Sequence, residues 1–248
     1  MKISSLGIIG SGYIGTAVAR LAVAAGLPAT VANSRGTQSL ADLVAELGPL
    51  ARAGTVDEAA AQSIVVLAIP FGAVSALSAV AFSGRVVIDA TNYFRDRDDG
   101  DARLNDASIT SSQYVQAALR GARVAKTLNT VDFLRLASLS RGSGAPDRAA
   151  LPLFGDDAVA IKSGTKLLDL LGFDAVELGG LAESWRAHPG TPLYVTPYQG
   201  GAPEGVEDPR ERFIRTETVQ VSAPRIRQLA LNARQSAPGT IADVSSSS

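Results

Sequence analysis

The chain has 248 residues, of which 46% are apolar and 19% charged, and its formal net charge is −1. This balance is typical of a globular protein and gives no electrostatic reason to expect nucleic acid or an anionic membrane as a partner. The absence of cysteine and the presence of one histidine, His188, exclude disulfides, thiolate-bound zinc, iron–sulfur clusters and multi-histidine metal sites.

No apolar run approaches the roughly 20 residues that span a bilayer. The first apolar run, at residues 6–9, is too short for a secretory signal. We therefore expect a cytoplasmic protein without a membrane partner.

The first half of the chain alternates short apolar runs with helical patterns, which is typical of βαβ units around a parallel sheet. Strands are predicted at 5–9, 29–32, 50–53, 64–69, 85–89 and 123–127. Helices are predicted at 13–25, 39–47, 71–80 and 111–119, with a brief helix opened by the capping-box spacing of 55–58. The charge-dense stretch 95–103 should be an exposed loop. Six strands with crossovers predict the doubly wound order 3-2-1-4-5-6.

The pattern changes after residue 138. Residues 139–147 are rich in Ser, Gly and Pro and predict a linker, and a strand–helix–strand unit is expected at 151–154, 158–171 and 174–178. Residues 183–209 show no clear periodicity, and a last helix is expected at 223–234. The fold prediction is therefore α/β: a doubly wound Rossmann sheet at 1–138, a small α/β C-terminal portion at 139–234, and a flexible tail at 235–248.

A glycine-rich turn follows the first strand. Gly10-Ser11-Gly12-Tyr13-Ile14-Gly15 matches G-x-G-x-x-G, and it opens an apolar helix, as dinucleotide-binding motifs require. The first glycine permits the tight turn, the second lets the backbone approach a pyrophosphate, and the third lets the helix pack on the sheet. The unpaired N–H groups at the start of the helix would face the phosphates. A purely structural glycine turn is the less favoured interpretation.

The end of the second strand indicates which dinucleotide binds. NAD-binding domains usually carry an acid there for the ribose 2′-hydroxyl, but this chain continues with Asn33, Ser34, Arg35, Gly36 and Thr37. Arg35 offers a planar fork of donors for a 2′-phosphate, and the hydroxyls of Ser34 and Thr37 lie beside it in the sequence. We therefore predict NADP(H), with a solvated loop arginine as the alternative.

Three further strands end in candidate site residues. Ala68, Ile69 and Pro70 could wall the nicotinamide, whereas Asn92 and Asn129 could bind its carboxamide or the substrate. For each asparagine a loop or capping role is an equally good interpretation.

At these residues the chain resembles the F420-dependent NADP oxidoreductase family. The resemblance covers about residues 5–180 and rests on the glycine motif, on residues 33–36, on residues 68–70 and on Lys126-Thr127-Leu128-Asn129-Thr130. It implies hydride transfer between NADPH and coenzyme F420, with the two rings stacked between the Rossmann domain and a small C-terminal portion. Transfer from ring to ring needs orientation more than an acid–base residue.

The chain departs from that family after residue 179, where it continues through a segment rich in aromatic residues. Trp185 and Tyr194 are predicted to contact the substrate, with plain packing as an equal alternative. His188 is the candidate proton donor, although a histidine without chemistry is the more frequent situation.

Three functions stay open at this point. The leading one is an NADPH-dependent F420 reductase. The second is a reductase of a small C=N, C=O or C=C substrate. The third is a non-catalytic NADP(H) sensor.

A homodimer is expected. The C-terminal region is apolar and aromatic, and little Rossmann surface is left against which it could pack. The predicted cofactor-binding residues are Gly10, Ser11, Gly12, Tyr13, Ile14, Asn33, Ser34, Arg35, Thr37, Ala68, Ile69, Pro70 and Asn92; those predicted for substrate are Asn129, Trp185 and Tyr194; no metal is expected.

Overall fold

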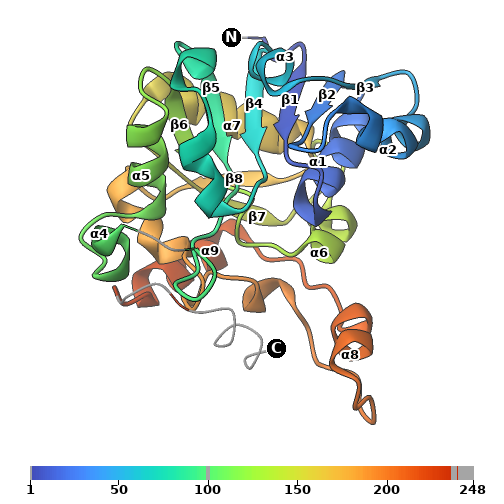
Figure 1. The fold of residues 1–248 in the computed structure, drawn as a ribbon. Helices are drawn as coiled ribbons and strands as arrows, with labels where there is room; N and C mark the ends of the chain where they lie inside the picture. The colour runs from blue at the N-terminus through green and yellow to red at the C-terminus, as the bar shows by residue number, and fades with distance from the viewer. Residues whose placement is uncertain (1, 99–100, 236–238, 240–248) are drawn as a thin grey trace.

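A computed structural model describes residues 2–98, 101–235 and 239 of the chain, and it is built around one eight-stranded sheet (Figure 1). The strand order is β3-β2-β1-β4-β5-β6-β7-β8, so the predicted order of the first six strands is confirmed. The strands are β1 Leu6–Ile9, β2 Ala29–Ala32, β3 Ala51–Ala53, β4 Ile64–Leu67, β5 Val86–Asp89, β6 Arg123–Lys126, β7 Ala150–Gly155 and β8 Asp174–Glu177.

Helices cover both faces of this sheet, which gives the doubly wound arrangement that the sequence predicts. The α-helices are α1 Tyr13–Ala24, α2 Ala41–Leu47, α3 Val56–Ala60, α4 Ala102–Asn105, α5 Ser111–Ala118, α6 Phe133–Leu139, α7 Ala158–Leu170, α8 Pro209–Arg215 and α9 Ala223–Asn232. The 3₁₀-helices are η1 Thr37–Leu40, η2 Phe71–Ala76, η3 Ala79–Phe82, η4 Leu181–Ala187 and η5 Thr196–Tyr198.

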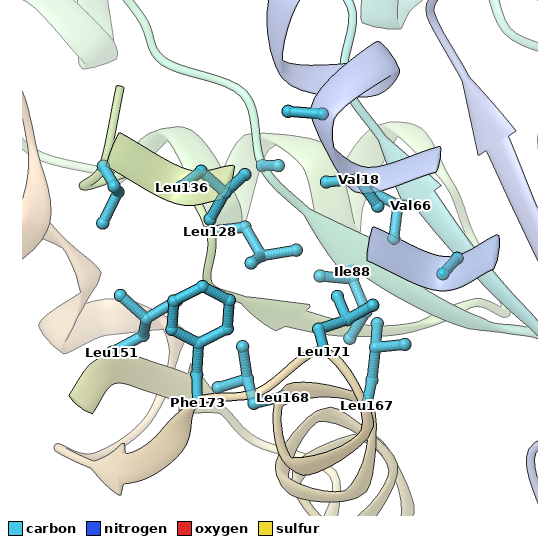
Figure 2. Packing of buried hydrophobic residues seen from close by; sticks show 14 of the residues in the cluster. Val18, Val66, Ile88, Leu128, Leu136, Leu151, Leu167, Leu168, Leu171 and Phe173 are labelled. Carbon is cyan, nitrogen blue, oxygen red and sulfur yellow. The ribbon is translucent and has the colours of Figure 1, made fainter. Parts of the chain in front are cut away.

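The central strands β1 and β4 are apolar throughout because both of their faces are buried. Alternate residues enter two separate cores: Val66 and Ile88 pack on the side of α1, α6 and α7, whereas Val65 and Val87 pack on the side of α3 and α5. Figure 2 shows the first of these cores, in which side chains from the sheet, α6 and α7 interdigitate around Phe173. This packing fixes α1 and α6 on the same face of the sheet.

The C-terminal strand–helix–strand unit extends the same sheet. β7 runs antiparallel to β6, with Ala125 opposite Gly155, and β8 runs parallel to β7. The predicted α/β C-terminal portion is therefore present, and its strands continue the Rossmann sheet. The proposed boundary at residue 138 falls at the end of α6, before the connection to β7. Most of the predicted tail at 235–248 lies outside the described residues.

Several local predictions need correction. In place of one α-helix at 71–80, the chain forms two short 3₁₀-helices, η2 and η3, because the backbone is extended at Leu77 and Ser78 between them. The stretch 95–103 is not wholly an exposed loop, since Asp98 is only 4% exposed and α4 begins at Ala102. Helix α6 was not predicted. Its sequence signal is the N-cap Asp132, whose carboxylate accepts hydrogen bonds from the N–H groups of Leu134 and Arg135.

The segment 183–209, which lacks periodicity, contains most of η4 and all of η5, and α8 begins at its end. The residues 199–218 form an arm whose two ends pair through Gln199 and Thr218. α8 lies in this arm, set off from the sheet on the side of α6 (Figure 1). No helix in the described part of the chain is long and apolar enough to cross a membrane.

Candidate functional site

The glycine turn between β1 and α1 has the geometry of a phosphate-binding loop. Gly10 has φ +112°, and a Cβ there would lie 2.1 Å from the carbonyl oxygen of Ala68. A Cβ at Gly15 would lie 1.9 Å from the carbonyl oxygen of Gly10. By contrast, a Cβ at Gly12 would meet no atom within 4 Å, and no side chain caps α1. Gly10 and Gly15 are therefore required by the fold, whereas Gly12 borders open space at the positive end of a helix.

The loop after β2 is tied to this turn through Ser11. Its hydroxyl accepts hydrogen bonds from Asn33 Nδ2 at 2.8 Å and from Arg35 Nη2 at 3.3 Å. Asn33 Oδ1 in turn accepts from the backbone N–H of Arg35 at 2.9 Å. Ser34, Arg35 and Thr37 are exposed, and Arg35 forms no ion pair with any described residue. The loop therefore presents an unneutralised guanidinium beside the phosphate turn.

These two features fit NADP(H). The open side of Gly12 leaves room for the pyrophosphate, and the uncapped start of α1 provides donors for it. Arg35 provides the charge that a 2′-phosphate requires, with no acidic side chain at residues 33–37 to repel it. The chemistry that the cofactor supplies when bound is hydride donation or acceptance.

The carboxyl ends of β5 and β6 are joined by two asparagines. Asn92 Nδ2 donates to the carbonyl oxygen of Asn129 at 3.0 Å, and Asn129 Nδ2 donates to Asn92 Oδ1 at 3.0 Å. Asn129 Nδ2 also donates to the carbonyl oxygen of Ala187 at 2.8 Å, while its Oδ1 is buried without a partner among the described residues. Ile69 and Pro70 are partly or fully exposed at the end of β4. The two asparagines thus brace the sheet edge at which the sequence places the nicotinamide.

Beneath this pair lies a buried ionic network that the sequence reasoning did not identify. Lys126 and Asp89 have fully buried side chains whose Nζ and Oδ2 atoms lie 3.1 Å apart. Asp89 also accepts from the hydroxyls of Thr91 at 2.6 Å and Ser112 at 2.9 Å, and Lys126 donates to the carbonyl oxygen of Thr91. Burial lowers the pKa of Lys126, and the attraction of Asp89 opposes this shift. A lysine that ends an apolar strand was the sequence signal that could have revealed the network.

His188 lies against this network and not at the surface. Its side chain is 6% exposed, and its Nε2 lies 3.2 Å from the Ser111 hydroxyl. Burial, together with the charge of Lys126, lowers the pKa of His188 to about 3. A neutral imidazole at pH 7 lacks the imidazolium proton that a histidine general acid donates, so the structure adds no support to the predicted catalytic role.

The predicted substrate residues Trp185 and Tyr194 are both partly buried. The Trp185 ring stacks with the Arg186 guanidinium at 4.4 Å, and Arg186 donates to the carbonyl oxygen of Ala230, which ties this end of η4 to α9. Burial raises the pKa of Tyr194 to about 12, an effect that the nearby Arg97 opposes. Tyr194 therefore keeps its phenolic proton at neutral pH.

The loop after β5 brings Arg97 to the same edge of the sheet. Its Nη2 donates to the carbonyl oxygen of Asn92 at 2.7 Å and to Asp98 Oδ2 at 2.7 Å. Asp98 also accepts from the backbone N–H groups of Phe94 at 3.0 Å and Gly72 at 3.2 Å. The buried carboxylate therefore fastens the connection that follows β5 to the one that follows β4.

A surface cavity with a volume of about 980 Å³ lies elsewhere, between α7 and β8. Asp157 at this cavity pairs with Arg123, which begins β6, so the cavity is at the opposite edge from Asn92 and Asn129. Its lining is mixed in charge and shares no residue with the predicted site. No group of three or more His, Asp or Glu side chains in the described ranges could hold a metal ion.

Comparison with known proteins agrees with this geometry. The family described as NADP oxidoreductase, coenzyme F420-dependent, matches residues 5–93. The structure of hypothetical protein SMa0349 from Sinorhizobium meliloti is 30% identical with a TM-score of 0.69, and the match covers 77% of this chain and 93% of that one.

Two further matches are more limited. A protein of Arthrobacter sp. FB24, described as a candidate F420-dependent NADP reductase, is 19% identical with a TM-score of 0.60, over 74% of this chain and 87% of that one. That likeness shows the fold. YjhV of Escherichia coli K12 is 39% identical over 69 residues, or 28% of this chain, and the match spans about half of YjhV, 47% of its length.

Proposed function

We propose, from the premise that this chain belongs to the family of coenzyme F420-dependent NADP oxidoreductases, that it transfers a hydride between NADP(H) and coenzyme F420 or a closely related acceptor. Membership of the family makes the chain an NADP-dependent oxidoreductase. The observation that carries the choice of cofactor is the pairing of an open Gly12 with the exposed, unneutralised Arg35.

In this proposal the chain binds and orients, and it supplies little acid–base chemistry. The glycine turn and the start of α1 hold the pyrophosphate, while Ser11, Asn33 and Arg35 hold the adenosine end. Ile69 and the braced pair Asn92 and Asn129 hold the nicotinamide. One hydride passes from NADPH to the acceptor ring, which takes one proton from water, so the products are NADP⁺ and the reduced acceptor. A neutral, buried His188 is compatible with a reaction that depends on orientation.

The test is turnover of the purified protein with NADPH and oxidised F420, followed through the absorbance of both compounds. We expect NADPH to be consumed only when F420 is present, in equal amounts, and NADH to be a poor substitute. NADPH consumption with F420 that leaves the deazaflavin oxidised would contradict the proposal. Tight NADPH binding without turnover of any acceptor would favour the sensor function.

Tyr194 favours a second candidate function, the reduction of a small C=N, C=O or C=C substrate. The next residue, Val195, donates its backbone N–H to the carbonyl oxygen of Thr130 after β6, which places Tyr194 at the carboxyl edge of the sheet. The phenol carries a proton at neutral pH that it could donate to a reduced substrate, and burial raises its pKa, which makes it a weaker acid than free tyrosine. A panel of imines, ketones and enones distinguishes the two functions. Under the second function Tyr194→Phe should lower the rate by about 10²-fold or more, whereas under the first it should lower the F420 rate by less than about tenfold.

A homodimer and a cytoplasmic location complete the proposal and rest on the sequence reasoning alone. Light scattering of the purified protein tests the first, and fractionation of the source cells tests the second.

A further inference from the structure

Three aromatic rings from distant parts of the chain lie in a row. Tyr13, the first residue of α1, stacks on Phe133, the first residue of α6, with ring centroids 4.4 Å apart and an angle of 17° between the planes. Phe133 in turn meets Phe213 of α8 at 6.1 Å and 45°. We call these three residues the aromatic ladder.

The outer ring of the aromatic ladder is open to solvent. Tyr13 is 74% exposed, although its ring is already stacked on Phe133, and it directly follows Gly12. An aromatic surface beside a polar, anion-binding turn is the composition of a ligand site, since small-molecule sites combine aromatic walls with a few placed polar groups. The exposed ring therefore borders the proposed cofactor site.

A buried arginine holds the third ring in place. Arg135 is 1% exposed, and its Nη2 donates to the carbonyl oxygens of Phe213 at 2.8 Å and Thr216 at 2.7 Å. Its Nη1 lies 3.2 Å from Asp132 Oδ2, and its guanidinium carbon lies 4.9 Å from the centre of the Phe213 ring. α8 buries no residue of its own, so these contacts and the ring contact with Phe133 position it. The aromatic ladder is thus a fixed surface and not a loose loop.

The position of the aromatic ladder separates it from the adenosine end of the site. Asn33 and Arg35 lie after β2, on one side of β1. Phe133 begins α6, which follows β6 on the other side of β1 and packs on the face of α1, so that the Phe133 ring reaches Tyr13. Tyr13 and Phe133 therefore connect the phosphate turn to the half of the sheet edge that carries Asn92 and Asn129. Nicotinamide and acceptor must meet on that half, because NADP(H) extends across the switch point next to β1.

We propose that the aromatic ladder is the surface on which the planar ring of the hydride acceptor lies, with Tyr13 in direct contact with that ring and Phe133 and Phe213 supporting Tyr13. This inference rests on the proposed function and adds to it the side chains against which the flat, extended heteroaromatic ring of the acceptor lies. A small carbonyl compound or imine would leave most of this surface uncovered. Residues 199–218 then serve to place Phe213 behind the stack.

The test is equilibrium binding of two planar probes, oxidised F420 and riboflavin, to NADP⁺-saturated protein, followed by fluorescence. Tyr13→Ala should weaken binding of the probes about tenfold, whereas Tyr13→Phe, which keeps the ring, should stay within about twofold of the wild type. The cofactor role predicted for Tyr13 uses the backbone N–H at the start of α1, which both variants keep, so the NADPH dissociation constant should change less than about threefold in both. Ile214→Ala is the matched control, since Ile214 neighbours Phe213 on α8, is 56% exposed and lies outside the aromatic ladder.

The outcomes separate the inference from the proposed function. Riboflavin binding that depends on the Tyr13 ring, without turnover of F420, would support the aromatic ladder and remove F420 as the acceptor. Wild-type protein that binds neither probe would overturn the inference, as would equal weakening of NADPH and the probes by Tyr13→Ala. A monomer–dimer shift in Tyr13→Ala would also overturn it, because it would place a second copy of the chain on the ring.

Discussion

At the scale of single residues, the three motif glycines have different tasks. Gly10 and Gly15 allow backbone contacts that any Cβ would block, at 2.1 Å and 1.9 Å. Gly12 has no such neighbour, so the fold does not require its lack of a side chain, whereas the proposed pyrophosphate site does. The distinction matters because all three look alike in the sequence.

The same substitution, glycine to valine, should therefore affect NADPH binding at Gly12 and thermal stability at Gly15. Gly12→Val should leave the unfolding temperature nearly unchanged and abolish NADPH binding, because the new side chain occupies the space for the pyrophosphate. Gly15→Val should instead destabilise the fold, because its Cβ meets the carbonyl oxygen of Gly10. Calorimetric titration with NADPH and thermal unfolding of both variants make the check. NADPH binding retained by Gly12→Val would show that the phosphates lie elsewhere.

Arg35 provides the second test at this scale. Removing a hydrogen bond to a charged group costs about 1.5–3 kcal/mol, so Arg35→Ala should raise the NADPH dissociation constant by roughly ten- to a hundredfold. NADH lacks the 2′-phosphate, and its affinity should barely move. Arg120→Ala removes the same charge from another exposed position and serves as the control. An equal loss for NADH and NADPH would mean that Arg35 acts through the conformation of its loop.

At the scale of elements, the arm at 199–218 depends on contacts with α6. Arg135 of α6 bonds two carbonyl oxygens of the arm and pairs with Asp132, the residue that caps α6. Arg135 is separated by 78 residues from Phe213 and by 81 residues from Thr216, so no local sequence pattern predicts these two contacts. A polar residue in an unpredicted helix therefore determines where α8 lies.

Arg135→Met should release this arm. Loss of a buried charge leaves Asp132 and two carbonyl oxygens without their partner, and we expect the free energy of unfolding to fall by about 3 kcal/mol. Trypsin should then cut faster within α8, after Arg210 or Arg212, two sites that the variant and its control both keep. The control is Arg215→Met, which breaks only the exposed pair with Glu211 and should change stability by less than about 0.5 kcal/mol. Unchanged cleavage and stability in Arg135→Met would contradict this account of the arm.

At the scale of the whole molecule, stability should depend on pH through His188. Its pKa is near 6.5 in the unfolded chain and is lowered to about 3 in the folded one. Between these values the unfolded state binds a proton that the native state does not, so stability is present above pH 6.5 and is lost as the pH falls toward 3. The buried neighbours Lys126 and Asp89 influence the same pKa, with Lys126 the stronger of the two.

His188→Gln isolates this contribution. The difference in unfolding free energy between wild type and variant should shift against the wild type by about 1.4 kcal/mol per pH unit below pH 6. Urea titrations between pH 4 and pH 8 measure it, and subtraction removes the effects of the titratable groups that the two proteins share. A difference that stays constant with pH would mean that His188 is charged or exposed in the folded state.

Several predictions needed only local information. The alternation of short apolar runs with helical patterns predicted the α/β class and the order of the first six strands. The glycine turn and the motifs that follow it pointed to the NADP oxidoreductase family. Each of these signals lies within one continuous stretch of sequence. The candidate cofactor residues Gly10, Gly12, Asn33 and Arg35 lie together in the structure, as the motif predicts, because one strand–turn–helix unit and the next strand carry them all.

The rest was decided by tertiary structure. The buried pair Asp89 and Lys126, the burial of His188 and the row of Tyr13, Phe133 and Phe213 each join segments tens of residues apart. Whether a polar side chain faces water or a partner depends on what packs against it, and no periodicity within its own segment records that partner. From the sequence alone the fold and a candidate cofactor loop could be predicted, whereas only the tertiary structure, in which η4 bonds to Asn129 and Arg135 holds α8 on α6, decided which side chains come together at the carboxyl edge of the sheet.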